Sequence, residues 1–325
     1  MKNLTIEEAI ELLIDGEVVA IPTETVYGLA ADARNDEAVG RIFKAKGRPS
    51  DNPLIVHIGD MAQVDRLVTD VSEGARLLMD HFWPGPLTII LPSSGVVSEL
   101  VTAGLTTVGL RMPSHKAALA LLRQSGMPLA APSANRSGKP SPTCAAHVVH
   151  DLEGRIAGVI DGGICEVGLE STVMDMTTDV PVILRPGNIS QRELESVIGH
   201  VAISNGFSDQ PKAPGMKYAH YSPDAEVYLV KGDHQHVAKV IRDFKEKNLK
   251  IGIVCCDATK ASYELADVVK EIGETGKHLY AVLRSFDAQG VDVVLCEFFD
   301  DMAIMNRLKK ASEERILIEV GKLKR

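Results

Sequence analysis

The sequence lacks the patterns that mark membrane-spanning, disulfide-rich and zinc-binding proteins. No segment approaches the roughly 18 continuous apolar residues that a membrane-spanning helix needs. The five cysteines are odd in number and form no Cys-x-x-Cys pair, so neither a disulfide framework nor a zinc site is predicted. The first helical pattern carries Glu7, Glu8 and Glu11, which is too acidic for a secretory signal or a transit peptide. We therefore expect a cytoplasmic protein with reduced thiols.

Common catalytic and nucleotide-binding signatures are missing as well. The sequence holds no Gly-x-x-x-x-Gly-Lys-Ser/Thr phosphate loop and no Gly-x-Gly-x-x-Gly fingerprint, so a bound nucleotide would need another device. No His-Glu-x-x-His motif or Ser-His-Asp arrangement supports a zinc hydrolase or a serine protease. The formal net charge of −9 disfavours nonspecific DNA coating, which depends on many Lys and Arg contacts with phosphates. A single basic cleft is still compatible with this net charge.

The sequence does contain a long alternation of helical and strand patterns. With 325 residues, 45% of them hydrophobic, the chain favours two domains. Thr5 and Glu8 fit a capping box at the start of the first helix. Strands then alternate with helices as far as residue 202, which is typical of α/β architecture. We therefore predict a first α/β domain over residues 1–202.

A linker and a second domain follow. Residues 203–224 are rich in Gly, Pro and polar residues, which predicts a linker. Residues 225–325 carry a second α/β pattern. Its expected helices lie near residues 237–247, 261–272 and 278–286.

Two pairs of polar residues are candidates for binding an anion. Lys46 and Arg48 stand where a helical pattern breaks, and together they supply a point charge and a planar fork for phosphate oxygens. Ser133 and Asn135 follow a short apolar strand and offer hydroxyl, amide and backbone donors. Each pair also has a simpler interpretation. Lys46 and Arg48 could form a solvated basic turn that offsets the helix dipole, and Ser133 and Asn135 could belong to an ordinary Pro-Ser turn.

Three further features suggest a binding site. His57 interrupts an apolar strand, although such a histidine is more often a core or edge residue. Arg111 ends a strand and could clamp a carboxylate, or form a surface ion pair. Residues 213–223 hold Met, Lys, His and two Tyr, whereas a plain spacer would be rich in Gly, Ser or charge. Such side chains suit a segment that packs against another part of the protein. A linker docked on a neighbouring domain would have the same composition.

Taken together, these motifs resemble the YrdC/Sua5 family in order and spacing. The matching segments are 22–29 (PTETVYGL), 46–49 (KGRP), 52–57 (NPLIVH), 83–88 (WPGPLT), 111–113 (RMP), 131–135 (APSAN) and 170–172 (EST). The family's Lys-x-Arg…Ser-x-Asn signature is met by Lys46, Arg48, Ser133 and Asn135. The linker and the second domain resemble the long Sua5 branch. The resemblance implies a YrdC-like twisted mixed-sheet domain followed by a smaller, Rossmann-like C-terminal α/β domain.

The resemblance implies L-threonylcarbamoyladenylate synthase activity, a nucleotidyltransferase reaction. L-threonine, bicarbonate and ATP would give threonylcarbamoyl-AMP, pyrophosphate and water. The product would pass to a tRNA threonylcarbamoyl transferase for tRNA modification, with no membrane or DNA partner. Mg²⁺ would accompany ATP, held by phosphates and water rather than by protein side chains.

The same resemblance implies a role for particular residues. Lys46 and Arg48 would be the catalytic residues. Those expected to bind ATP are Lys46, Arg48, Ser50, Thr107, Ser133, Asn135, Ser141, Arg185 and Tyr218. Those expected around threonine are Thr23, His57, Arg111, Ala131 and Ser171. Arg111 would hold the threonine carboxylate, and Tyr218 in the linker would close over the nucleotide.

Two other functions remain open at this point. One is a carbamoyl-adenylate-forming enzyme of the hydrogenase-maturation type, but such proteins carry acylphosphatase and zinc-finger-like segments, and this sequence has no Cys-x-x-Cys pair. The other is an RNA-binding module with a concave basic surface, which the net charge of −9 weakens.

Overall fold

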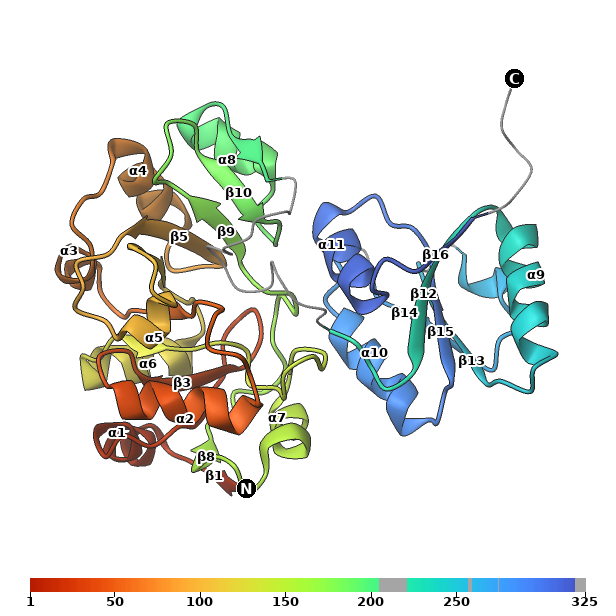
Figure 1. Cartoon of the computed structure of the whole chain (residues 1–325), viewed down its shortest axis with the longest axis horizontal. Helices are drawn as coiled ribbons and strands as arrows, with labels where there is room; N and C mark the ends of the chain where they lie inside the picture. Colours follow the sequence, from red (N-terminus) through yellow and green to blue (C-terminus); the bar gives the residue numbers. More distant parts are fainter. Residues whose placement is uncertain (205–220, 257–258, 274, 319–325) are drawn as a thin grey trace. The chain divides into compact units, whose positions relative to one another are not determined.

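The computed structural model describes residues 1–204, 221–256, 259–273 and 275–318, which form two compact units (Figure 1). The described residues of the first unit are 1–137 and 141–204, and those of the second are 138–140, 221–256, 259–273 and 275–318. Within these ranges no helix has the length and the apolar character needed to cross a bilayer.

The first unit is built on an 11-stranded mixed sheet with the strand order β1-β8-β2-β3-β7-β4-β6-β5-β9-β10-β11. The strands are β1 (Lys2–Asn3), β2 (Val19–Ile21), β3 (Gly28–Asp32), β4 (Ile55–His57), β5 (Leu87–Pro92), β6 (Thr107–Arg111), β7 (Leu129–Ala130), β8 (Gly158–Val159), β9 (Thr172–Asp175), β10 (Val182–Arg185) and β11 (Ala202–Ile203). At its centre β6 pairs parallel with β4 and antiparallel with β5. The predicted α/β class with a mixed sheet is confirmed.

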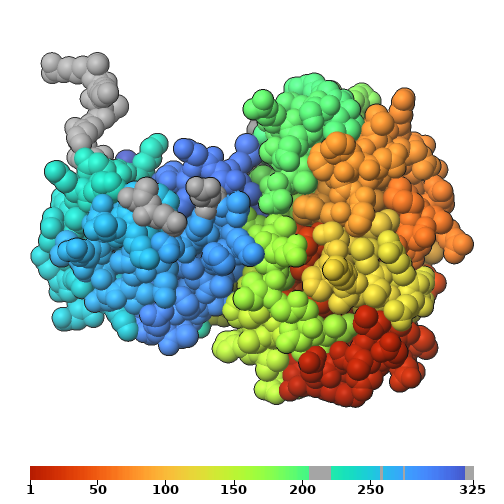
Figure 2. All heavy atoms as spheres, turned by 180° about the vertical axis from the view of Figure 1, so that it is seen from behind, coloured from red at the N-terminus to blue at the C-terminus, as the bar shows by residue number. Residues whose placement is uncertain are grey.

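Helices surround this sheet. They are α1 (Ile6–Ile14), α2 (Asp36–Lys46), α3 (Val64–Leu67), α4 (Glu73–Phe82), α5 (Glu99–Thr102), α6 (Lys116–Ser125), α7 (Ala145–Leu152) and α8 (Gln191–Ile198), with a 3-10 turn, η1, at Met61–Gln63. Figure 2 shows a side of the unit on which α1 (red), α6 (yellow) and α4 (orange) reach the surface. The predicted capping box of Thr5 and Glu8 is confirmed at the start of α1.

Residues of the central strands alternate between two faces of the sheet. Val56 of β4 and Leu110 of β6 belong to the large core cluster that packs against the helices. Ile55, Ile90 and Val173 come from the alternate positions of β4, β5 and β9 and form a small separate cluster on the other face. His57 is in register with Arg111, two residues beyond the pair Ile55–Gly109, so the polar candidates share the face of the small cluster.

Helix α2 ends at Lys46, the first of two candidate cations. It begins after Asn35, whose side chain accepts from the Glu37 and Ala38 amides. It ends at Gly47, whose left-handed backbone (φ 64°) reverses the chain after Lys46. Lys46 is therefore the last helical residue, and Arg48 belongs to the segment that follows.

The second unit is a smaller α/β fold with a parallel sheet in the order β14-β13-β15-β12-β16. Its elements are β12 (Glu226–Lys231), α9 (His234–Lys245), β13 (Ile251–Cys255), η2 (Lys260–Ser262), β14 (Val268–Glu271), α10 (Leu279–Ala288), β15 (Val293–Cys296), α11 (Met302–Ala311) and β16 (Ile316–Ile318). The central strands β13 and β15 are buried throughout, as parallel strands covered on both faces are.

One expected helix of the second unit is wrong. Residues 261–272 hold only a 3-10 turn and the strand β14, which pairs parallel with β13. Val268 and Val269 are β-branched, and pairing with Gly252 and Ile253 outweighs the helical spacing of the apolar residues.

Candidate functional site

A tight turn after β2 brings Thr23 and Thr25 to the site. The Thr23 hydroxyl donates to the Val26 carbonyl at 2.6 Å and accepts from the Thr25 and Val26 amides at 3.2 Å. Both threonine side chains are buried, and their Oγ1 atoms lie 2.9 Å apart. The hydroxyl of Thr23 is therefore largely committed to holding the turn, like an Ser/Thr-turn side chain.

Glu24 and Arg111 form a buried ion pair, with exposed fractions of 3% and 4%. Arg111 Nη2 lies 2.6 Å from Glu24 Oε1, Nη1 donates to Thr25 Oγ1 at 2.9 Å, and Nε donates to the Gly85 carbonyl at 3.2 Å. The Ser114 amide donates to the other carboxylate oxygen. A guanidinium has five N–H donors, so two remain after these three bonds to described residues, one on each terminal nitrogen. A surface ion pair, the alternative for Arg111, is wrong.

His57 lies beside Arg111 on β4 and is 3% exposed. Burial, together with the charge of Arg111, lowers the pKa of His57 to about 3, so the ring is neutral near pH 7. Its Nδ1 has no partner among the described residues. Because a buried polar atom without a partner costs about 1–3 kcal/mol, such an atom calls for a ligand or a water. A neutral imidazole can supply one donor and one acceptor to it.

Lys46 is buried against the loop that carries Ser133 and Asn135. Its Nζ donates to the Ser133 carbonyl and, at 2.8 Å, to the Asn135 carbonyl, with Asn135 Oδ1 at 3.5 Å. Burial, and then the charge of Arg48, hold the pKa of Lys46 well below its usual value. The structure thus brings together Lys46, Ser133 and Asn135, and a solvated basic turn does not describe Lys46.

Arg48 and Asn52 lie along the segment that follows α2. Arg48 Nη2 donates to the Asn52 carbonyl at 3.3 Å and to the Pro53 carbonyl at 3.4 Å. Ser50 is exposed and makes no side-chain hydrogen bond within the described ranges. The Asn52 side chain is fully buried, yet neither its oxygen nor its nitrogen finds a partner in the described part of the chain. Burying an unpaired amide is costly, so Asn52 becomes a candidate binding residue.

Ser141, Ser171 and Arg185 are buried and belong to a further set of polar contacts. Arg185 Nη2 donates to the Ser171 carbonyl at 3.0 Å and to its hydroxyl at 3.1 Å. The Ser171 hydroxyl lies 2.8 Å from Thr88 Oγ1, and the Ser141 hydroxyl donates to Glu170 Oε1 at 2.5 Å. These contacts fix the side chains of Thr88, Ser141 and Ser171.

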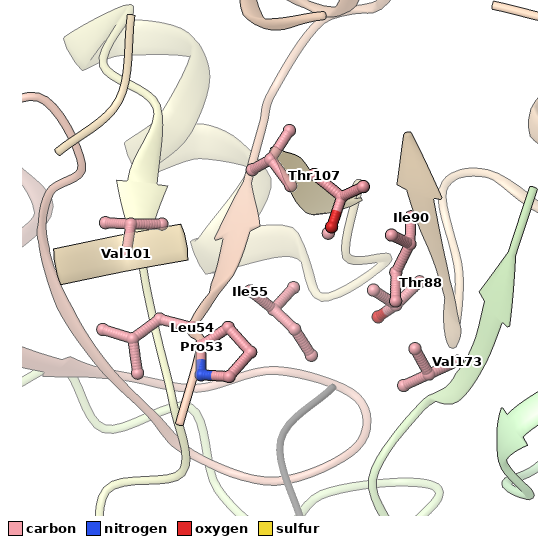
Figure 3. A pocket seen from close by; sticks show the side chains of 10 residues that line it. Pro53, Leu54, Ile55, Thr88, Ile90, Val101, Thr107 and Val173 are labelled. Carbon is pink, nitrogen blue, oxygen red and sulfur yellow. The ribbon is translucent and has the colours of Figure 1, made fainter. Parts of the chain in front are cut away.

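The remaining predicted residues have separate positions. Thr107 begins β6 and lines a hollow in the sheet face (Figure 3). Ala131 follows β7, and its amide donates to the Ile55 carbonyl at 3.0 Å, which leaves its own carbonyl as the group it can offer. Tyr218 lies outside the described residues.

Sequence reasoning misses four polar residues that the site contains, Glu24, Asn52, Thr88 and Glu170. All four are buried and stand inside the motifs quoted above. A charged or amide side chain within such a motif is the signal that could have marked them. Three of them contact a predicted residue. Glu24 accepts from Arg111, Glu170 accepts from Ser141, and the Thr88 hydroxyl lies 2.8 Å from that of Ser171.

Comparison with known protein families decides the assignment. The model of the Sua5/YciO/YrdC family, described as "Telomere recombination", matches residues 11–187, more than half of the chain. The chain belongs to the Sua5/YrdC family. A second family model, described as the C-terminal domain of threonylcarbamoyl-AMP synthase, matches residues 189–313. The resemblance inferred from the motifs, including the long two-domain form, is confirmed.

Individual relatives match along nearly the whole chain. Threonylcarbamoyl-AMP synthase of Bacillus subtilis is 49% identical over 326 residues, covering 96% of this chain and 94% of that protein. The Pyrococcus abyssi protein of the same name is 49% identical over 318 residues, covering 93% and 92%. The crystal structure of P. abyssi Sua5 complexed with L-threonine superimposes with a TM-score of 0.91 at 45% identity, covering 98% of each chain.

These matches disfavour the hydrogenase-maturation type of enzyme as a description of this chain. That alternative requires acylphosphatase and zinc-finger-like segments. The matched family models cover residues 11–187 and 189–313 with the two Sua5-type domains instead. The long Sua5 form is therefore the better description of the whole chain.

Proposed function

We propose that this chain is an L-threonylcarbamoyladenylate synthase, a nucleotidyltransferase that makes threonylcarbamoyl-AMP from L-threonine, bicarbonate and ATP for tRNA modification. The observation that carries the proposal is the buried Arg111. It is held by Glu24, keeps two donors for a carboxylate and stands beside the neutral His57. The likeness to a Sua5 structure complexed with L-threonine and the relatives named threonylcarbamoyl-AMP synthase support it.

The threonine end of the cleft follows from these charges. Arg111 binds the threonine carboxylate with its two remaining N–H groups, and the Glu24 carboxylate fixes the plane of the guanidinium. His57, neutral because of its lowered pKa, bonds the ligand without repelling its amine. Thr23, Ala131 and Ser171 complete the surroundings of the amino acid. The amine then attacks CO₂ derived from bicarbonate, loses a proton and becomes a carbamate, while bicarbonate leaves a hydroxide that takes up that proton as water.

The nucleotide end supplies the positive charge that the next step needs. A carbamate oxygen attacks the α-phosphorus of ATP, the bond to the bridging oxygen breaks, and pyrophosphate leaves with that electron pair. Lys46 and Arg48 neutralise the charge on the phosphates, and no covalent protein nucleophile is needed. The other proposed ATP contacts are Ser50, Asn52, Thr107, Ser133, Asn135, Ser141, Arg185 and Tyr218.

Mg²⁺ is proposed as the companion of ATP, held by phosphate oxygens and water. Among the described residues no group of three or more His, Cys, Asp or Glu side chains is placed to hold a metal ion. The ion would neutralise phosphate charge, and the protein's part is to orient the phosphates through Lys46 and Arg48.

The roles of the domains and the fate of the product are proposed from the same family resemblance. Residues 1–202 form the catalytic domain, 203–224 a linker that serves as a lid, and 225–325 the C-terminal domain. Closure of the lid would exclude water, which decomposes both the carbamate and the mixed anhydride. The product goes to a tRNA threonylcarbamoyl transferase in the cytoplasm.

Product analysis tests the function. The purified full-length chain is incubated with ATP, L-threonine and ¹³C-bicarbonate, and the products are identified by mass spectrometry. Threonylcarbamoyl-AMP carrying the ¹³C label supports the proposal. AMP without the labelled adduct, or tRNA binding with no ATP binding, would favour a different adenylating enzyme or the RNA-binding alternative.

A further inference from the structure

A pocket of the first unit opens between α4, α6 and the loop that follows β4. The segments around α4 (orange) and α6 (yellow) meet on the face that Figure 2 shows. The pocket has a volume of about 340 Å³, within the range of about 300–1,000 Å³ that small-molecule sites occupy. None of the residues proposed above to bind threonine or ATP lines it. It is therefore a cavity that the proposed reaction does not use.

The floor of this pocket is apolar and rich in methionine. Met61, Met79 and Met112 line it together with Trp83, and all of these except Met61 are buried. Methionine side chains are flexible and polarisable, so they adapt to apolar groups of different shapes. Trp83 Nε1 already donates to the Leu87 carbonyl at 2.7 Å. These side chains therefore suit an apolar group and offer no strong hydrogen-bond partner to a hydroxyl.

Three charged side chains line the same pocket, namely those of Asp60, Asp80 and Arg123. Arg123 Nε donates to the Gly59 carbonyl at 3.1 Å, while its two terminal nitrogens make no hydrogen bond to the described residues. One Asp60 oxygen accepts from the Ala62 amide at 2.8 Å. Asp80 makes no side-chain hydrogen bond or ion pair within the described ranges. Opposite charges thus share one cavity without pairing with each other.

A ligand that matches these groups carries both charges close together, next to an apolar group. A guanidinium with both terminal nitrogens open can bind a carboxylate in a bidentate way, and two carboxylates can hold an ammonium group. We propose that this pocket binds a free α-amino acid with an apolar side chain. Its carboxylate lies on Arg123, its ammonium group lies between Asp60 and Asp80, and its side chain covers the methionine floor.

The pocket and the proposed threonine site are connected by one turn but have no lining residue in common. Gly85 follows Pro84, which lines the pocket. The Gly85 carbonyl accepts from Arg111 Nε at 3.2 Å, and the Gly85 amide donates to the Met112 carbonyl at 2.8 Å. Because the two sites use different side chains, we expect threonine and the apolar amino acid to bind at the same time.

Calorimetry tests the inference by measuring binding of L-leucine and of L-phenylalanine to the full-length chain saturated with L-threonine. We expect binding of at least one of them, with an affinity that falls about tenfold in Arg123→Met and about threefold in Asp80→Asn. Arg66→Met is the matched control, because Arg66 is exposed on α3 and does not line the pocket. The threonine affinity of each variant, which should match that of the wild type, checks that it folds.

Two analogues test the same inference on the unaltered chain. 4-Methylpentanoate lacks the ammonium group of leucine, and N-acetyl-L-leucinamide lacks both charges and represents a leucine within a partner protein. Each should bind at least about tenfold more weakly than L-leucine.

Four results would overturn the inference. They are no binding of either amino acid, displacement of leucine by threonine, equal affinities in Arg123→Met and the wild type, and N-acetyl-L-leucinamide binding as tightly as leucine. The last of these would indicate a docking site for a protein side chain. Every readout is binding rather than turnover, so the inference and the proposed synthase activity can fail independently.

Discussion

Glu24 Oε1 lies 2.6 Å from Arg111 Nη2 in a setting that is almost closed to solvent. The carboxylate is held in turn by the Ser114 amide. Within a buried ion pair, removing one partner leaves the other charge uncompensated, so the two residues act as a unit. Glu24 is therefore a positioning residue for Arg111, the proposed carboxylate clamp.

Glu24→Gln tests this relationship. The amide keeps the size of the side chain but not its charge, so Arg111 loses its fixed orientation. We expect kcat/KM for threonine to fall about 10–100-fold and the free energy of unfolding to fall by about 2–3 kcal/mol. Steady-state kinetics and urea unfolding measure the two effects. Glu17→Gln is the control, because Glu17 pairs with Arg41 at the surface and should lose less than about 1 kcal/mol. Unaltered threonine kinetics in Glu24→Gln would contradict the assignment.

The pH dependence of stability should show that the His57 ring is neutral in the folded protein. Its folded pKa is about 3. The unfolded histidine takes up a proton near pH 6.5, so the unfolded state binds more protons between these values and stability falls as pH falls. From about pH 7 to about pH 5 the wild type should lose about 2 kcal/mol more than His57→Gln.

Urea unfolding at the two pH values measures this difference. Exposed His81→Gln serves as the control and should follow the wild type. Equal losses in wild type and His57→Gln would show that His57 is not held neutral by burial.

Asn52 should show opposite effects on stability and on activity. Its buried amide has no partner within the described residues, so it costs stability in the absence of a ligand. Asn52→Leu should leave the free energy of unfolding unchanged or raise it by about 1 kcal/mol, while KM for ATP rises about 10–100-fold. Thermal unfolding and ATP titrations test both. A large loss of stability with normal KM for ATP would make Asn52 a purely structural residue.

Lys46 should affect turnover more than threonine binding. Lys46→Met removes the charge and leaves the Ser133 and Asn135 carbonyls without their donor. We expect kcat to fall about 10²–10³-fold, since a preorganised cation near the reacting phosphate is lost. Threonine affinity should stay within about twofold, because Arg111 and His57 are untouched. Lys44→Met, at an exposed position of the same helix, is the control, and the idea fails if both variants have the same kcat.

The sequence predicts the cation and hydroxyl residues of the site better than it predicts their partners. Lys46, Ser133 and Asn135 belong to a recognisable signature, and the structure brings them together. The pairing of Glu24 with Arg111 joins residues 87 positions apart and depends on the order of the intervening strands. No local pattern encodes that order.

Local patterns are likewise insufficient to predict parts of the fold. The α/β class follows from alternating patterns, whereas β14 lies where helical spacing predicts a helix, because β-branched Val268 and Val269 pair with β13. Likewise, the hollow that Thr107 lines becomes visible only when β4, β5, β6 and β9 are side by side. Both features are properties of strand pairing rather than of any one segment.

Pyrophosphate release from ATP tests the central claim most directly, namely that threonine and ATP react in one cleft. The full-length chain is assayed in the complete reaction mixture, without L-threonine and without bicarbonate. The Lys46→Ala variant is assayed in the complete mixture. The account predicts release only when both co-substrates are present, and none above background in Lys46→Ala. Release that ignores threonine and bicarbonate, from protein that still binds ATP, would contradict it.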